Sequence, residues 1–93
     1  HKIENLVKSS EKKDLYSVVG PVCETADSFG SDFEVSANAG DCLVVYSAGA
    51  YGSSMGSNYN TRLKPAEILV DQKSHKVIRK AETFDDLIKE EEL

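Results

Sequence analysis

The sequence predicts a mainly β domain, a β-barrel or sandwich of short strands with one short C-terminal helix. Three short apolar runs, rich in β-branched residues and bounded by turn-forming neighbours, predict strands at residues 15–22, 41–46 and 66–71. Strands at such short spacing are typical of barrels and sandwiches. A single helix signal follows the last run. At 93 residues, 40% of them apolar and 29% charged, the chain has the size and composition of one small globular domain.

The first strong strand is the one at residues 15–22. It is short and β-branched, and Gly20 with Pro21 bends its end. Pro21 has no N–H to donate, so it fits only at an edge or an exit of a sheet. Weaker patterns predict a strand at residues 1–7 and a short strand at 33–35. Turns are predicted at 9–14 and 38–41, and a loop at 24–32.

The second strong strand, at residues 41–46, is almost continuously apolar. Such a run predicts burial on both faces, with Cys42 as an inert core thiol. Residues 47–57 are then almost all small, with Tyr51 and Met55 as the exceptions. Small residues fit a flexible loop, and they equally permit close approach of the backbone to a ligand or to another chain.

The C-terminal third predicts a hairpin and the one helix. Residues 66–71 form a third core strand, and residues 76–80 pair back with it across a polar turn. Thr83 is a candidate N-cap that forms an imperfect capping box with Asp86. The like charges at residues 90–92 oppose the helix dipole, so the last turn is expected to fray.

Composition excludes several classes of function. The formal net charge of −5 argues against nucleic acid, because phosphate binding needs clustered Lys and Arg. The two cysteines have neither zinc-ligand spacing nor the pattern of a disulfide scaffold, and no metal site is predicted. No apolar run approaches the ~20 residues that span a membrane. Reduced thiols and the absence of a signal-like N-terminus favour the cytoplasm.

The candidate site residues lie where two predicted strands end. Cys23 and Glu24 follow the first strong strand, and Tyr51 follows the second. The sequence therefore suggests one shared site, in which a thiol, a carboxylate and a phenol come from the ends of two strands. From the residue types alone, a packed structural cysteine and a solvated surface glutamate are the more usual roles of Cys23 and Glu24.

Several short motifs carry a resemblance to a known family. They are Val-Gly-Pro-Val-Cys-Glu-Thr-Ala-Asp at 19–27, Ala-Gly-Ala-Tyr-Gly at 48–52, Met55 with Asn-Tyr-Asn at 58–60, and Pro-Ala-Glu at 65–67. In this order they resemble the C-terminal part of the diaminopimelate decarboxylases, pyridoxal-phosphate (PLP) lyases of the alanine-racemase-like fold group. The resemblance spans most of the chain and implies that residues 1–93 are the C-terminal β-domain of such an enzyme.

The resemblance also implies a role for each candidate residue. Cys23 matches the acid that protonates the substrate carbon after carbon dioxide leaves, and Glu24 matches the residue that binds the distal end of the substrate. Both would project into the active site of the other subunit of a homodimer. Tyr51 would touch the cofactor and the substrate in its own subunit. Thiols have an ordinary pKa of about 8.5, so a cysteine at neutral pH is a suitable proton donor.

The cofactor would be held mainly elsewhere. The Schiff-base lysine and the glycine-rich phosphate loop of the family belong to a TIM-like barrel domain that these 93 residues do not contain. The chain alone is therefore expected to be inactive. Ser47 stands where the family commonly has aspartate, which leaves the polar contact of that position open. Asp27 is expected to support the site or the subunit interface without taking part in the chemistry, and Arg62 is a candidate partner for an acidic neighbour across the dimer.

The substrate and the class of function have alternatives. Glu24 followed by Thr-Ala-Asp favours meso-diaminopimelate, converted to lysine and carbon dioxide in lysine biosynthesis, because relatives acting on ornithine or lysine usually carry aspartate there. A related PLP decarboxylase of another basic amino acid is the nearest alternative. A stand-alone, non-catalytic β dimerisation module is the alternative from a different class.

Overall fold

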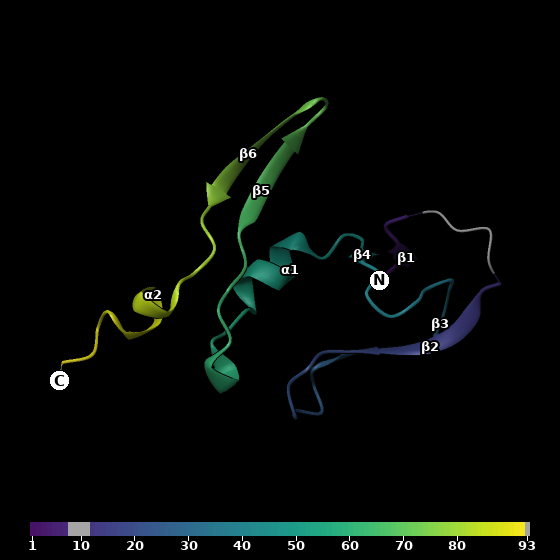
Figure 1. The fold of residues 1–93 in the computed structure, drawn as a ribbon, viewed down its shortest axis with the longest axis horizontal. Helices are drawn as coiled ribbons and strands as arrows, with labels where there is room; N and C mark the ends of the chain where they lie inside the picture. Colours follow the sequence, from purple (N-terminus) through teal and green to yellow (C-terminus); the bar gives the residue numbers. More distant parts are fainter. Residues whose placement is uncertain (8–11, 93) are drawn as a thin grey trace. The chain divides into compact units, whose positions relative to one another are not determined.

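The computed structural model describes residues 1–7 and 12–92. They fall into two compact units, which divide between Ser53 and Ser54. The first unit holds β1, β2, β3, β4 and most of α1, at Ile3–Asn5, Asp14–Val19, Ser28–Val35, Leu43–Val45 and Gly49–Ser54 (Figure 1). The second holds a 3₁₀ turn η1, strands β5 and β6 and helix α2, at Tyr59–Thr61, Glu67–Asp71, Ser74–Arg79 and Phe84–Ile88.

Two antiparallel strand pairs build the first unit. β1 pairs with β4, with Ile3 opposite Val45, and β2 pairs with β3. β1 also packs against β3, and the two buried apolar side chains of the described residues come from these strands, Ile3 at 6% and Val35 at 4% exposure. The rings of His1 and Phe29 add an edge-to-face contact between the start of the chain and β3. The core of this unit therefore lies between the two pairs.

The β2–β3 ladder is irregular. Its register shifts on both sides of Val18, and β3 contains Gly30 and Asp32 at positive φ, 116° and 65°. Glycine, and to a lesser degree aspartate, tolerates this region, and such residues accompany bulges that bend a hairpin. The loop predicted at 24–32 is thus wrong from residue 28 onward, because pairing with β2 outweighs the turn-like composition.

The second unit contains the predicted hairpin and helix. β5 pairs with β6 from Glu67–Arg79 to Asp71–Ser74, leaving a two-residue connection at 72–73. Thr83 caps α2 in a full capping box: its hydroxyl accepts from Asp86 N at 3.2 Å, and its N–H donates to Asp86 Oδ2 at 2.9 Å. Both predictions are confirmed, and α2 ends before the acidic tail at 90–92.

Burial is where the sequence prediction fails. The strand predicted at 41–46 is only Leu43–Val45, and Cys42 is exposed rather than a core thiol. The apolar residues of β5 and β6 are likewise exposed, among them Ile68, Val70 and Val77. The reason is that the described strands form three separate two-stranded sheets, so each strand has one neighbour.

The fold class is mainly β with short helices, as predicted. Two short helical segments, α1 and η1, add to the single helix that the sequence predicted, and α1 replaces part of the small-residue loop at 47–57. Closure into a barrel or sandwich stays a prediction. Half of the turn predicted at 9–14, residues 9–11, lies outside the described residues, and Asp14 itself begins β2.

Candidate functional site

Cys23 and Glu24 lie in the loop at the tip of the β2–β3 hairpin (Figure 1). The last paired residues are Val19 and Ser28, so the tip loop comprises residues 20–27. Gly20 N donates to Asp27 O at 2.8 Å and closes its base. The predicted strand at 15–22 therefore ends three residues early, since Pro21 has no N–H to extend the ladder.

Cys23 sits at the centre of a very tight turn in this loop. Glu24 N donates to Val22 O at 2.8 Å, which closes a three-residue turn around Cys23. Asp27 N donates to Glu24 O at 3.0 Å and closes a second turn directly after it. The side chain of Cys23 is exposed. The backbone thus presents the thiol outward from a tightly turned segment.

Glu24 is exposed beside the thiol. Its Oε1 accepts from the Thr25 hydroxyl at 3.3 Å and from Ala26 N at 3.4 Å. Both distances exceed the usual ranges, about 2.5–3.0 Å for a hydroxyl donor and about 2.7–3.2 Å for an amide donor, so these bonds are weak. The carboxylate is therefore kept near its own loop and remains accessible to a cationic ligand.

Asp27 also belongs to this loop, and the sequence assigned it no part in the chemistry. Its Oδ2 accepts from Val22 N at 2.9 Å, and its main chain makes the two bonds already described. The carboxylate also lies against Gly20, where any Cβ would overlap it. In the sequence this contact corresponds only to a glycine seven residues before an aspartate, and that spacing alone does not predict a contact.

Tyr51 lies on another element of the first unit. It belongs to α1, whose turn is closed by Gly52 N donating to Ala48 O at 2.7 Å. Its side chain is 70% exposed, and its hydroxyl makes no hydrogen bond within the described residues. No hydrogen bond joins it to Cys23 or Glu24 there either. The structure therefore places Cys23 and Glu24 together in one loop and Tyr51 on a separate element, α1.

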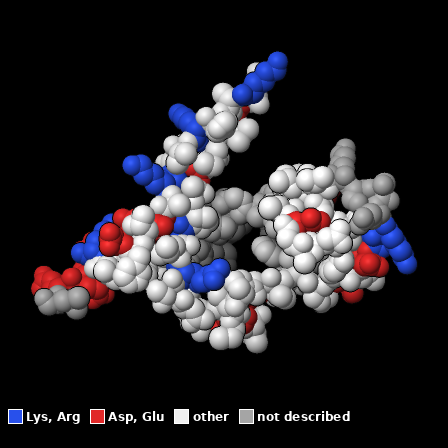
Figure 2. Space-filling view, in the orientation of Figure 1, with Lys and Arg blue, Asp and Glu red and all other residues white. Residues whose placement is uncertain are grey.

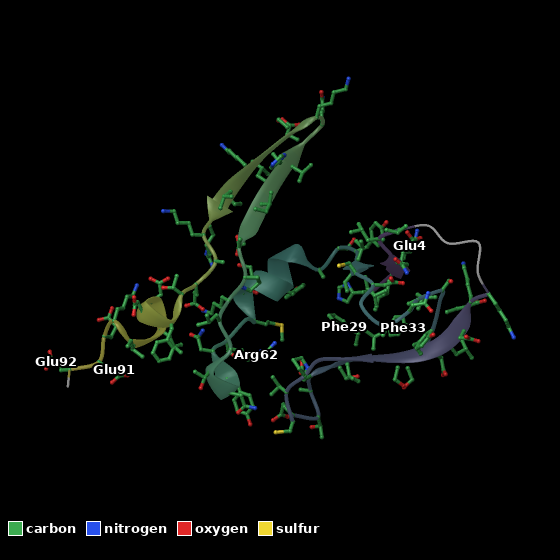
Figure 3. All side chains as sticks on the ribbon, in the orientation of Figure 1. Glu4, Phe29, Phe33, Arg62, Glu91 and Glu92 are labelled. Atoms are coloured by element: carbon green, nitrogen blue, oxygen red, sulfur yellow. The ribbon has the colours of Figure 1, made fainter. Side chains whose placement is uncertain are left out.

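In the second unit, Glu82 organises the segment around the Asn-Tyr-Asn motif. Its Oε1 accepts from Lys64 N at 2.6 Å and from Asn58 Nδ2 at 2.7 Å, and Asn58 Nδ2 also donates to Arg62 O at 3.0 Å. The bond from Lys64 N, and to a lesser extent the bond from Asn58, lowers the pKa of Glu82 below its ordinary value. Arg62, labelled in Figure 3, is itself exposed. The motif therefore organises a turn, and no local sequence pattern pointed to Glu82.

A polar cluster on the β1–β4 pair was not predicted. Lys2 Nζ lies 3.0 Å from one oxygen of Glu4 and 5.2 Å from the ring centre of Tyr46, whose hydroxyl donates to the other oxygen at 3.0 Å (Figure 3). The hydrogen bond to Lys2 lowers the pKa of Glu4. All three groups are exposed, so the cluster contributes little to stability.

Charge and metal-binding groups do not mark another site. In Figure 2 basic side chains are frequent along the β5–β6 hairpin and acidic ones near the C-terminal end, and no single field of one charge covers the visible face. Within the described ranges 1–7 and 12–92, no group of three or more His, Cys, Asp or Glu side chains is placed to hold a metal ion. None of the helices described is long and apolar enough to cross a membrane.

Comparison with known proteins identifies the relatives of the chain. Residues 1–49 match the family model described as the pyridoxal-dependent decarboxylase C-terminal sheet domain. These residues include the tip loop with Cys23 and Glu24.

Individual relatives agree with this match. The chain is 45% identical over 83 residues to a diaminopimelate decarboxylase of Neisseria meningitidis serogroup B, covering 85% of this chain and 20% of that protein. It is 51% identical over 76 residues to the one of Haemophilus influenzae, covering 82% and 18%. A crystal structure of diaminopimelate decarboxylase from M. jannaschii, in co-complex with L-lysine, matches all of this chain and 21% of its own, with a TM-score of 0.90 and 39% identity. The chain spans about a fifth of the length of these relatives.

Proposed function

The chain belongs to the family of pyridoxal-dependent decarboxylases, as their C-terminal sheet domain, and from this premise we propose that it contributes Cys23, Glu24 and Tyr51 to a diaminopimelate decarboxylase. The observation that carries the proposal is the tip loop. It presents an exposed thiol and an adjacent exposed carboxylate from a tight turn, within the segment that matches the family. The identity to diaminopimelate decarboxylases supports the choice of substrate.

The residues present fit part of a PLP site. The exposed hydroxyl of Tyr51 makes no hydrogen bond within the described residues, and a phenol O–H can donate to a phosphate or a carboxylate while its ring packs. When bound, PLP supplies an electron sink for the bond that breaks. The Schiff-base lysine would come from the barrel domain that the resemblance implies.

Cys23 would act as the general acid. The bond between the substrate carbon and its carboxylate breaks, carbon dioxide leaves, and that carbon takes the proton from Cys23 Sγ. The thiolate then regains a proton from water. Positioned proton donors of this kind contribute typically about 10²–10⁴-fold in rate.

Glu24 would bind the far ammonium group of the substrate. Its long bonds to Thr25 and Ala26 are easily exchanged for a bond to an ammonium group, in which the donor and the acceptor are both charged. The substrate would thus be held at its distal end by the residue next to the proton donor. In a homodimer, both would serve the active site of the partner subunit.

The test is a chimera in which residues 1–93 replace the matching segment of the M. jannaschii enzyme. This relative is suitable because it matches the whole chain. We expect release of carbon dioxide from meso-diaminopimelate with PLP, and a fall in turnover of about 10²–10⁴-fold in the Cys23→Ala variant with unchanged PLP content. A Cys42→Ala variant is the matched control, since Cys42 is also exposed but lies outside the tip loop.

Other outcomes separate the alternatives. An active chimera with unchanged turnover in Cys23→Ala would contradict the proton-donor role. Turnover of ornithine or arginine in place of diaminopimelate would move the assignment to a related decarboxylase. A folded chimera that binds PLP but acts on none of them would favour a non-catalytic dimerisation module. The dimer arrangement is tested by mixing Cys23→Ala chimeras with chimeras that lack the Schiff-base lysine: shared sites would recover activity.

A further inference from the structure

Asp27 makes hydrogen bonds to three other residues of the tip loop, through its main chain and through its carboxylate. The main-chain oxygen of Asp27 accepts from Gly20 N, and its own N–H donates to Glu24 O. Its carboxylate accepts from Val22 N at 2.9 Å. One residue therefore ties the start, the middle and the end of the loop together.

The carboxylate contact is directed at the residue that precedes Cys23. Val22 N is held by Asp27 Oδ2, while Val22 O closes the tight turn around Cys23 through Glu24 N. Both main-chain polar groups of Val22 are therefore hydrogen-bonded, its N–H to Asp27 and its C=O to Glu24 N. Fixing Val22 fixes the direction in which Cys23 and Glu24 leave the loop.

Gly20 makes this contact sterically possible. A Cβ at position 20 would overlap both oxygens and Cγ of Asp27. The carboxylate occupies the space that any other residue's side chain would need. The position of the Asp27 carboxylate therefore depends on glycine at position 20. Asp27 is half-buried, whereas Cys23 and Glu24 are exposed.

We propose that Asp27 is a positioning residue, which acts through its bond to Val22 N and the space over Gly20 to aim the Cys23 thiol and the Glu24 carboxylate at the substrate. This rests on the proposed function, in which those two groups meet the substrate. Hydrogen bonds to a charged acceptor are stronger than neutral ones, and misplacing a reacting group by about 1 Å can cost about 10²-fold in rate.

The experiment uses the chimera with three variants and a control. Asp27→Ala removes the acceptor, Gly20→Ala denies the carboxylate its place, and Asp27→Asn keeps the shape and one acceptor oxygen. Asp14→Ala is the control, because Asp14 is an exposed aspartate at the other end of the same hairpin, opposite Val35. Two readouts are measured: amide hydrogen exchange of the peptide covering residues 20–27, and kcat and KM for meso-diaminopimelate.

We expect the peptide at 20–27 to exchange about 10–100-fold faster in Asp27→Ala and Gly20→Ala, the factor for losing a hydrogen bond to a charged group. In the same variants kcat falls and KM rises, since Cys23 and Glu24 are both displaced, and kcat/KM drops about 10–100-fold. Asp27→Asn recovers most of both readouts, and Asp14→Ala changes neither.

A merely structural role gives a different pattern. General unfolding spreads faster exchange over the whole chain and lowers Vmax at constant KM, and this result would overturn the proposal. So would unchanged exchange at 20–27 in Asp27→Ala, or faster exchange there with unchanged kcat and KM. Cys23→Ala separates this from failure of the proposed function: if Cys23→Ala lowers turnover and Asp27→Ala does not, only the positioning role fails.

Discussion

Truncation of Ile3 tests where the core of the first unit lies. Ile3 is 6% exposed on β1, and Ile3→Ala removes three carbon atoms from that position. At about 0.8 kcal/mol per buried CH₂, the loss is about 2.3 kcal/mol of unfolding free energy. Ile3 also lines an open cavity together with Val35, so the vacated space joins existing solvent-accessible volume. The cost therefore lies near the lower limit of the usual range of about 2–5 kcal/mol.

Leu6→Ala is the matched control for this prediction. It removes the same number of carbon atoms from the same end of the chain, but Leu6 is 64% exposed, so the same reasoning gives about 0.9 kcal/mol. The difference of about 1.4 kcal/mol corresponds to about tenfold in the unfolding equilibrium constant. Urea unfolding of the chain, followed by circular dichroism, measures both variants. Equal costs, or a larger cost for Leu6→Ala, would refute a core between β1 and β3.

Three further predictions concern the helix cap, the Glu82 network and the substrate contact. Thr83→Ala should cost about 0.5–2 kcal/mol and remove the exchange protection of residues 84–88, and normal protection there would contradict the capping box. Because the pKa of Glu82 is lowered from its ordinary value of 4.5, its stabilisation of the Lys64 amide should be complete above that pH and lost as pH falls through the lowered value. An NMR titration of that amide checks this, with Glu82→Gln expected to show no such transition. Glu24→Gln in the chimera should raise KM about 10–100-fold, and an unchanged KM would remove Glu24 from the substrate contact.

The parts of the fold predicted from sequence are those set by local interactions. The capping box at Thr83 depends on residues three apart, and the β5–β6 hairpin depends on two short runs joined by a turn. The short strand predicted at 33–35 is the last part of β3. Residues 28–32 of β3 were missed because Gly30 and Asp32 resemble loop residues, and only pairing with β2 makes them part of a strand. The exposure of Cys42 was missed because burial depends on how many strands lie beside β4.

The candidate site was predictable to a similar extent. Cys23, Glu24 and Tyr51 follow from motifs, because the chemistry resides in residue types at fixed spacing, and their roles remain proposals. Asp27 could not be assigned in this way. Its contacts with Val22 and Gly20 exist only once the tip loop has folded, and hydrogen bonds of an exposed loop leave no periodic pattern in the sequence.

The two-stranded sheet of β5 and β6 bears on how the protein behaves in solution. Within the described residues each of these strands has one neighbour, so each presents an outer edge of backbone groups on which a further strand can add. Charged side chains are the usual protection against such addition, and Lys76 and Arg79 place them along β6. On β5 the charges stand only at the two ends, Glu67 and Asp71, and the run at 68–70 between them carries none. Self-association should therefore begin at the β5 edge. Added salt should promote it, because screening weakens the repulsion between hairpins.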